Sequence, residues 1–407
     1  MLKDNEKVIL IEKNNELGGV STLGGFNTWE GGFSDRGVHF KLAKYLLENK
    51  KGGVGKTIGE VCKETPYHYS KIFENERYED TLKRGETIKR FHFEAEDMSK
   101  MMLYLLRLYP NLTIMFNTKF KDVNVKNNRI ESVIVKHSVD EQIYEIKAKY
   151  FSDCTGDILL ARKAGCAHTI GEESYEEYKE PSAPKKASNY IKGVSQIIRI
   201  TKTKTKRVYK MPMEYINENT RKWMKNIYEY KQVAKINEYP NKDLNINLLS
   251  TMDGREYMLL HKEDRQYYLH SRMYAYFEFL TKQIGFDTYK IAYIFPQVGI
   301  RETYRLKGQY VLTENDIVNN TFKNNVVCYG DYPIDVYEEN NKSMELKGPY
   351  GIPKECILTN EYENLVVVSR GSSFSHIAAS SCRTPRTMIA LGEGSAKILF
   401  SMFKNII

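Results

Sequence analysis

The chain has 407 residues, more than a single hydrophobic core usually organises, so we expect two domains. Its 61 Lys and Arg residues against 52 Asp and Glu give a net charge of +9, which is spread along the chain and does not indicate a nucleic-acid partner. With 41% hydrophobic residues and no apolar run of about 18 residues, no membrane span is predicted, and we expect a cytoplasmic protein.

Six cysteines are scattered singly along the sequence, at positions Cys62, Cys154, Cys166, Cys328, Cys356 and Cys382. No two of them form the C-x-x-C pair that is typical of zinc sites, iron–sulfur clusters and redox disulfides, so we expect reduced thiols and no metal site. In the most basic segment, Lys202, Lys204 and Lys206 alternate with threonine. This period favours a strand with one solvated face over a nucleic-acid-binding segment.

The chain opens with an apolar run, from Val8 to Ile11, that ends on Glu12 and is followed by Gly18 and Gly19. An acid at the end of a parallel strand can accept both hydroxyls of a nucleotide ribose, and glycines allow the backbone to approach a pyrophosphate. Such an acid normally follows a G-x-G-x-x-G turn by about 20 residues, and no such turn precedes it in this sequence. The alternative interpretation is a surface acid followed by an ordinary helix cap.

Two amphipathic helices are predicted next, over residues 39–50 and 94–109. Residues 112–137 then alternate apolar and polar side chains around a turn, which predicts a meander of antiparallel strands that extends over about 112–150. A further strand ends at "DCTGD", which runs to Asp157. This turn either presents Asp157 and backbone amides to a polyol chain or is a plain strand-to-helix connection.

Residues 170–295 have long helical patterns rich in Tyr and Lys and no recognisable motif, so we assign them to a second domain. A loop, a short strand and a helix follow, with Thr313 as the N-cap and Asp316 at the capping-box position. A buried strand, "NLVVVSRG", and a helix opened by Pro385 come last. Because strands and helices interleave at both ends, we predict an α/β fold in which two distant segments share one sheet.

The segment before the last helix concentrates positive charge through His376, Arg383 and Arg386. A helix N-terminus with such neighbours suits an anion or an electron-rich ring, although a lone histidine is more often structural. A separate segment, "KGGVGKT" (51–57), matches the phosphate-binding loop of partition-type ATPases. Because that loop needs a strand before it and a helix after it, and a helix ending at its glycines precedes it here, nucleotide hydrolysis is the least favoured function.

Five segments occur in an order and spacing that resemble the FAD-dependent oxidoreductases with a glutathione-reductase-like flavin fold. They are "EKNNELGGVSTLGG", "SDCTGD", "VGIRETYRLKGQYVLTENDI", "GPYGIPKECI" and "NLVVVSRGSSFSHIAASSCRTPRTMIALGEGSAKIL". The resemblance runs from residue 1 to about residue 400 and is weakest between 170 and 295. It implies FAD as the cofactor and hydride transfer at flavin N5 to or from a small-molecule substrate.

The resemblance also implies roles for individual residues. The acid at position 12 would bind the ribose, the glycines after it would lie along the pyrophosphate, and two later segments would contact the flavin. The implied cofactor-binding residues are Glu12, Gly18, Gly19, Ser21, Thr22, Thr155, Gly156, Asp157, Arg370, Gly371, Gly392 and Gly394. The implied catalytic residues are Arg301, His376 and Arg383. These three would bind and polarise an anionic or carbonyl-bearing substrate, with the histidine as the proton donor.

The sequence departs from the family pattern at its start, where a standard strand and G-x-G-x-x-G turn would need about 25 more residues. We therefore predict an incomplete Rossmann-like FAD-binding domain from residues 1–169 and 296–407, with an inserted α+β substrate domain over 170–295. The alternative function is that of a truncated, catalytically silent paralogue, acting as a binding or scaffold protein or surviving as a non-functional remnant. No second dinucleotide fingerprint is present, which disfavours a nicotinamide as the electron partner.

Overall fold

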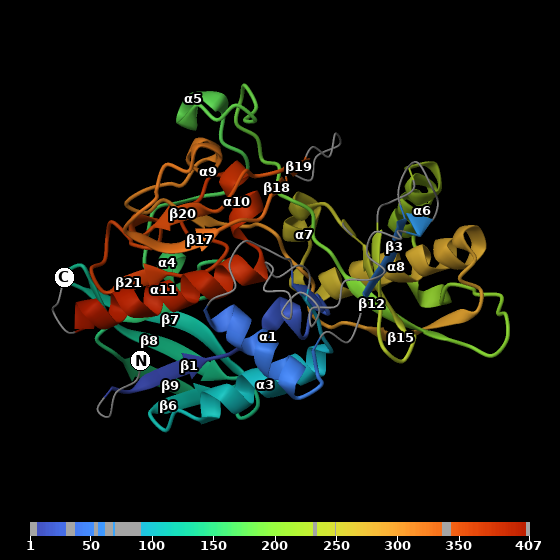
Figure 1. Cartoon of the computed structure of the whole chain (residues 1–407), viewed down its shortest axis with the longest axis horizontal. Coiled ribbons are helices and arrows are strands. Elements are labelled where there is room, and N and C mark those ends of the chain that lie inside the picture. Colours follow the sequence, from blue (N-terminus) through green and yellow to red (C-terminus); the bar gives the residue numbers. More distant parts are fainter. Residues whose placement is uncertain are drawn as a thin grey trace.

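The computed structural model describes residues 6–29, 37–52, 56–61, 68–69, 91–230, 234–248, 250–335 and 343–403. Two bodies lie side by side in Figure 1, a larger one around several small sheets and a smaller one around a six-stranded sheet. The structure is thus a mixed α/β fold, as the interleaved patterns predicted. None of the helices in the described part of the chain is long and apolar enough to cross a membrane.

Two short parallel strand pairs belong to the larger body. β1 (Val8–Ile11) pairs with β6 (Leu112–Met115), and β10 (Phe151–Asp153) pairs with β21 (Leu365–Val367). All three residues of β21 are buried, as a strand covered on both faces requires. The second pair confirms the prediction that two distant segments share one sheet.

The meander starts later than the sequence pattern predicted. β7 (Thr118–Lys126), β8 (Arg129–His137) and β9 (Ile143–Lys147) form an antiparallel sheet. The turn between the first two uses Asn127 and Asn128 with φ of 50° and 54°, a left-handed conformation that asparagine tolerates. The run at 112–115 was predicted as the first meander strand, which is wrong, because its parallel partner is the apolar strand β1.

The remaining elements of the larger body surround these strands. Its other strand pairs are β2 (Thr28–Trp29) with β5 (Phe91–His92), β11 (His168–Thr169) with β16 (Arg305–Leu306), β17 (Val326–Gly330) with β20 (Tyr350–Pro353), and β18 (Ile334–Asp335) with β19 (Ser343–Met344). Its helices are α1 (Val38–Glu48), α3 (Ala95–Arg107), α4 (Leu159–Lys163), α5 (Tyr175–Tyr178), α9 (Glu314–Asn319), α10 (His376–Cys382) and α11 (Pro385–Phe403), with 3-10 turns at Gly19–Ser21 and Lys354–Cys356.

Local signals placed several of these helices correctly. Thr313 caps α9, and its hydroxyl and the Asp316 carboxylate form the predicted capping box. Pro385 opens α11, which lies against β17. That contact is close, since a Cβ on Gly394 of α11 would overlap the backbone oxygen of Val327.

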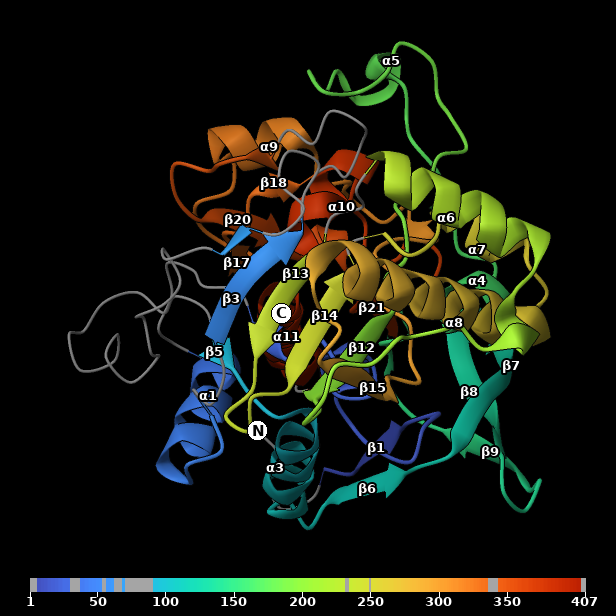
Figure 2. The same ribbon diagram turned by 90° about the vertical axis from the view of Figure 1, so that its right-hand side faces the viewer.

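The smaller body is a six-stranded antiparallel sheet covered by helices, with α8 lying across the sheet in Figure 2. The strands in spatial order are β15 (Tyr289–Ile294), β12 (Ile197–Lys202), β14 (Leu244–Leu248), β13 (Ala234–Glu238), β3 (Lys56–Val61) and β4 (His68–Tyr69). The helices are α6 (Glu218–Tyr230), α7 (Gly254–Leu259) and α8 (Lys262–Phe279), with a 3-10 turn at Met213–Tyr215 and a π turn at Leu280–Ile284. Apolar residues of α8, such as Met273 and Phe277, pack on Ile198, Ile236 and Ile246 of the sheet.

Two strands of this sheet come from a part of the sequence that the domain prediction placed in the other body. β3 pairs with β13, and β4 extends the sheet beyond β3. β3 also bears on the phosphate-loop alternative, because Lys56 and Thr57 begin a strand where such a loop requires a helix. Gly53 and Gly55 of that segment lie outside the described residues.

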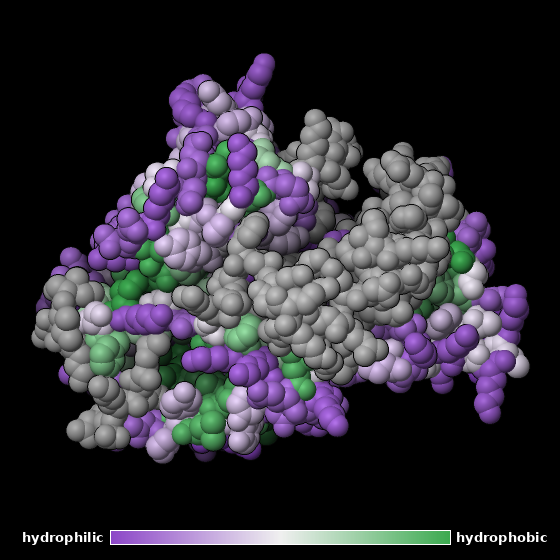
Figure 3. Space-filling view, in the orientation of Figure 1, coloured by the Kyte–Doolittle hydropathy of each residue, from purple (hydrophilic) through white to green (hydrophobic). Residues whose placement is uncertain are grey.

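The predicted basic strand ends before the lysine–threonine alternation does. β12 ends at Lys202, and Lys204 and Lys206 follow in a connection in which Lys206 pairs with Asp287 at 3.0 Å. The alternation of lysine and threonine therefore continues past the last strand residue into a solvated turn. Figure 3 shows hydrophilic side chains over much of the described surface of one face, as the abundance of charged residues predicts.

Candidate functional site

Segments from three parts of the sequence meet at the carboxyl ends of β1, β10 and β21. Ile11 at the end of β1 packs against the cluster that contains Phe151 and Val367 of the other two strands. Beyond these ends, Asp157 lies within electrostatic reach of Lys13 and pairs with Arg370. The carboxyl ends of parallel strands are where α/β folds bind nucleotides, which makes this junction the candidate cofactor site.

Glu12 is the first residue after β1, at the place the ribose-binding prediction requires. Its backbone N–H donates to the Met115 carbonyl at 2.9 Å, which continues the parallel pairing. One carboxylate oxygen accepts the Asn14 N–H at 2.9 Å. Burial raises the pKa of Glu12 despite this hydrogen bond. The carboxylate is thus partly desolvated and fixed in orientation, a state suited to accepting hydroxyl groups.

The glycine segment after Glu12 forms a tight turn. Gly18 and Gly19 have φ of 97° and 51°, a left-handed conformation that favours glycine. At Gly18 a Cβ would in addition overlap the Thr22 side chain. The Thr22 hydroxyl donates to the Leu17 carbonyl at 2.6 Å, and the Ser21 hydroxyl accepts the indole N–H of Trp29 at 3.0 Å. The Thr22 hydroxyl thus donates its proton inside the protein, whereas the Ser21 hydroxyl accepts a hydrogen bond there, and the turn offers its backbone to a ligand.

The "DCTGD" segment is organised by its first acid. Asp153 accepts hydrogen bonds from the Thr155 amide at 2.9 Å, from the Thr155 hydroxyl at 2.6 Å and from the Ala161 amide at 3.0 Å. The Thr155 hydroxyl in turn accepts the Leu159 amide at 2.7 Å. These contacts hold the turn against the start of α4. Thr155 and Asp153 thus shape the backbone, while Asp157 faces the neighbouring segments.

Asp157 and Arg370 form an ion pair at 2.5 Å, and the Thr303 hydroxyl donates to the same carboxylate at 2.7 Å. Burial alone would raise the pKa of Asp157, but the Arg370 guanidinium and the Thr303 hydroxyl outweigh it and lower the pKa. Gly156 allows this approach, since any Cβ there would overlap the guanidinium. Arg370 Nε is buried and has no hydrogen-bond partner among the described residues, so one donor of this junction is unused.

The other glycines predicted to bind cofactor differ in their surroundings. Gly371 follows Arg370, and a Cβ there would lie 2.8 Å from the Tyr304 carbonyl oxygen, so this glycine permits close backbone packing. Gly394 permits the packing of α11 on β17. Gly392, two residues earlier on the same helix, has no atom within 4 Å of its would-be Cβ. Of the two helical glycines, Gly392 alone borders open space.

His376 lies in a buried ionic network, which we define as Lys192, Glu302, Arg305, Glu173 and His376. Its Nδ1 is 2.9 Å from Glu302, and its backbone N–H donates to Glu173 at 2.8 Å. Lys192 Nζ donates to the His376 carbonyl at 2.6 Å and to Glu302 at 3.3 Å, while Arg305 pairs with both glutamates. All five side chains are buried.

Burial, together with the Lys192 and Arg305 cations, lowers the pKa of His376 well below its usual range. Burial and Arg305 likewise lower the pKa of Lys192. The imidazole is thus neutral near pH 7, and it is only 2% exposed. A neutral and buried imidazole is a weak proton donor, and the donor role of His376 stays a prediction. The network was missed in the sequence, although Lys192 in the largely apolar segment "NYIKGVSQII" was a signal for a buried cation.

The two predicted catalytic arginines lie near this network but do not share one partner. Arg301 is 7% exposed and donates to the Gly193 carbonyl at 2.6 Å. Arg383 follows the last residue of α10 and lies close enough to Lys192 to contribute to its lowered pKa. The structure therefore brings the three predicted catalytic residues around one segment, Lys192 and Gly193, rather than to one open pocket.

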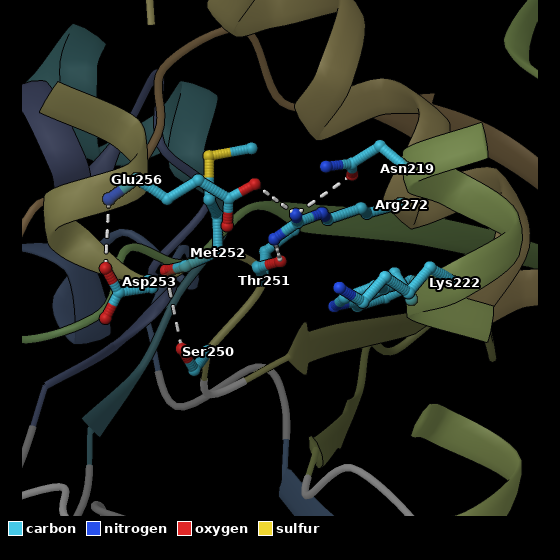
Figure 4. Close-up of a pocket in the computed structure, with 9 residues that line it drawn as sticks. Asn219, Lys222, Ser250, Thr251, Met252, Asp253, Glu256 and Arg272 are labelled. Atoms are coloured by element: carbon cyan, nitrogen blue, oxygen red, sulfur yellow. Dashed lines mark hydrogen bonds and ion pairs between the residues drawn. The ribbon is translucent and has the colours of Figure 1, made fainter. Parts of the chain in front are cut away.

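An open cavity of about 440 Å³ lies on the smaller body, between α6, α8 and the loop from Ser250 to Asp253. Figure 4 shows Arg272 among the lining residues, where it bonds to Asn219, Thr251 and Glu256. The sequence analysis did not identify this site. A signal existed, because Arg272 follows Leu269 and precedes Tyr276 at helical spacing on the apolar face of α8.

Comparison with known proteins identifies a family. The family model described as FAD dependent oxidoreductase matches residues 2–399. No curated protein sequence matches the chain. Similar solved structures include a myxobacterial chondrochloren halogenase, with 9% sequence identity, coverage of 99% of this chain and 71% of that chain, and a TM-score of 0.43. Another is a geranylgeranyl bacteriochlorophyll reductase-like protein from Thermoplasma acidophilum, with 11% identity, coverage of 98% of this chain and 73% of that chain, and a TM-score of 0.42. A glycine oxidase from Bacillus cereus is also similar, with 12% identity, coverage of 99% of this chain and 90% of that chain, and a TM-score of 0.39.

Proposed function

Because the chain belongs to the FAD-dependent oxidoreductase family and its cofactor is FAD, we propose that it oxidises or reduces a small-molecule substrate by hydride transfer at flavin N5. When bound, FAD supplies the hydride acceptor or donor, and the protein supplies binding, orientation and electrostatics. The observation that carries this proposal is the approach of the residues on either side of Glu12, Ile11 and Lys13, to the segments that hold Asp157 and Arg370 at the carboxyl ends of three strands. This arrangement offers a desolvated acceptor and an unused buried donor at one junction.

The residues present fit FAD in their chemistry. Glu12 would accept the ribose hydroxyls, and the left-handed turn at Gly18 and Gly19 would lie along the pyrophosphate. The Asp157–Arg370 pair would face the flavin side, where Arg370 Nε has a donor to spare. Thr22 would act through its backbone, since its hydroxyl donates to the Leu17 carbonyl, and Ser21 would act through its backbone or the proton of its hydroxyl, which accepts the Trp29 N–H.

The remaining assignments rest on the same proposal. Thr155, Gly156 and Gly371 would shape the backbone beside Asp157, and Gly392 would leave room on α11. Gly394 would act by seating that helix.

We assign the substrate side to residues 170–295, together with the β3–β4 hairpin that completes their sheet. His376 would hold the side chains of Lys192 and Glu302 in place, and Arg301 would fix the position of the Gly193 carbonyl. The larger body, from residues 1–169 and 296–407, would hold the cofactor.

The test is the visible absorbance spectrum of the purified chain, repeated after denaturation to release bound flavin. A two-banded flavin spectrum in near-stoichiometric amount supports the proposal. A colourless protein that stays colourless after incubation with FAD refutes it and favours a binding protein without flavin chemistry.

Glu12→Gln tests the ribose assignment within the same experiment. A charge-assisted hydrogen bond contributes about 1.5–3 kcal/mol, so FAD affinity should fall at least about tenfold. Glu16→Gln, four residues away on the same segment, serves as the matched control and should retain parental affinity. Equal losses in the two variants would show that position 12 has no special role.

A further inference from the structure

The cavity on the smaller body is large enough to hold a small-molecule substrate. Its volume of about 440 Å³ falls within the range of about 300–1,000 Å³ that small-molecule sites occupy. Asn219, Lys222 and Trp223 of α6 form one side, and Arg272 of α8 forms the back. Figure 4 shows Arg272 and Lys222 reaching into the space between α6 and the loop at Ser250.

Arg272 is an unusual wall residue because it is a cation that is only 5% exposed. Its guanidinium donates to the Thr251 carbonyl and the Asn219 side chain, each at 3.1 Å, and pairs with Glu256. Arg272 Nε still lacks a hydrogen-bond partner among the described residues. Burial lowers the pKa of Arg272 although Glu256 opposes this effect. The fold thus holds a partly unsatisfied cation at the back of the cavity, a cost that an anionic ligand would offset.

The cavity is lined by two cations, Arg272 and Lys222, and by two acids, Asp253 and Glu256, and both acids already have partners inside the protein. Glu256 is already paired with Arg272, and Asp253 Oδ1 accepts the amides of Arg255 and Glu256 at the start of α7. Lys222 is exposed and makes no ion pair with any residue that the structure describes. One cation at the mouth therefore remains available to a ligand.

The cavity is also connected to the proposed redox site. Tyr257, next to Glu256 on α7, lies within electrostatic reach of Asp157 and Arg370. On the opposite side, a Cβ on Gly193 would overlap the Ser250 hydroxyl, and Arg301 holds the Gly193 carbonyl. Residues at the edge of the cavity thus neighbour the segments assigned to the flavin.

We infer that this cavity binds the carboxylate of a small substrate with a flat apolar body, an inference that rests on the proposed function. Lys222 receives the carboxylate at the mouth, and Arg272, whose charge is shared with Glu256, has its unpartnered Nε donor behind it. The Trp223 ring, whose centroid lies 5.5 Å from the Arg272 guanidinium, and the Met252 side chain provide the apolar walls.

The experiment is isothermal titration calorimetry of the full chain with benzoate, and with benzamide as its neutral counterpart. Benzoate should bind at least about tenfold more tightly than benzamide. Lys222→Ala should weaken benzoate binding about fivefold or more, whereas Arg221→Ala, the exposed neighbour on α6 that does not line the cavity, should leave it within about twofold. Equal binding of the two probes, equal losses in the two variants, or no saturable heat at millimolar benzoate would overturn the inference.

This readout is independent of the flavin spectrum. A colourless chain that binds benzoate through Lys222 refutes the proposed redox function and supports the carboxylate site. A flavin-containing chain that does not distinguish benzoate from benzamide refutes the carboxylate site alone. Arg272→Lys, which keeps the charge but loses the planar fork, should weaken benzoate binding while circular dichroism shows a folded protein.

Discussion

The two glycines of α11 give a matched test of how the helix sits on the sheet. A Cβ on Gly394 would overlap the Val327 oxygen and lie 2.7 and 2.8 Å from the Val327 carbonyl carbon and Cγ2, so Gly394→Ala must move the helix away from β17. Overpacking of this kind costs about 1–3 kcal/mol. Gly392→Ala meets nothing within 4 Å and gains only helix propensity, about 1 kcal/mol.

The two variants should therefore differ by about 2–4 kcal/mol in the free energy of unfolding, with opposite signs relative to the parent chain. Urea unfolding followed by far-ultraviolet circular dichroism measures this difference. If Gly394→Ala is as stable as Gly392→Ala, the close packing of α11 on β17 is incorrect. Flavin content gives a second readout, since Gly392→Ala should lower it only if that position faces the cofactor.

Three further changes test other parts of the structure. Glu302→Gln should lower the free energy of unfolding by about 3–5 kcal/mol, because it leaves buried cationic donors without their charged partner. Glu363→Gln, which removes an exposed ion pair, should lower it by less than about 1 kcal/mol. Similar urea midpoints for the two variants would contradict this prediction. Burial raises the pKa of Glu180 from 4.5 to about 7, so the folded state binds the extra proton and the parent should lose stability as the pH rises from about 4.5 to 7. Glu180→Gln should remove that slope, and parallel profiles of unfolding free energy against pH would refute the assignment. Thr313→Ala, which removes the cap of α9, should cost about 1 kcal/mol in the same urea assay, and no change would show that the capping box contributes nothing.

Features with local physical causes could be predicted from the sequence. The capping box of Thr313 and Asp316, the asparagine turn of the meander and the helix opened by Pro385 each depend on residues within a few positions of one another. The shared sheet was also predictable, because β21 is a short apolar run and both β10 and β21 are followed by glycine-containing turns.

The rest depends on contacts that no local pattern encodes. β6 is as apolar as a meander strand, and only the presence of β1 decides its pairing. The buried network joins Lys192, Glu302 and His376 from three distant segments, so the sequence pattern indicated the histidine but not its partners. The cavity on the smaller body likewise forms only where α6 and α8 come together, so the position of Arg272 in its lining could not be predicted from α8 alone.

The β3–β4 hairpin also constrains the order in which the chain can fold during synthesis. At 5–20 residues per second, the roughly 170 residues between β3 and β13 take about 10–35 s to emerge. During that interval the edge of β3 that will face β13 has no native partner. An unpaired strand edge is a site of wrong association. The smaller body can therefore close only after the ribosome has passed β13, and the larger body only later, when β21 reaches β10.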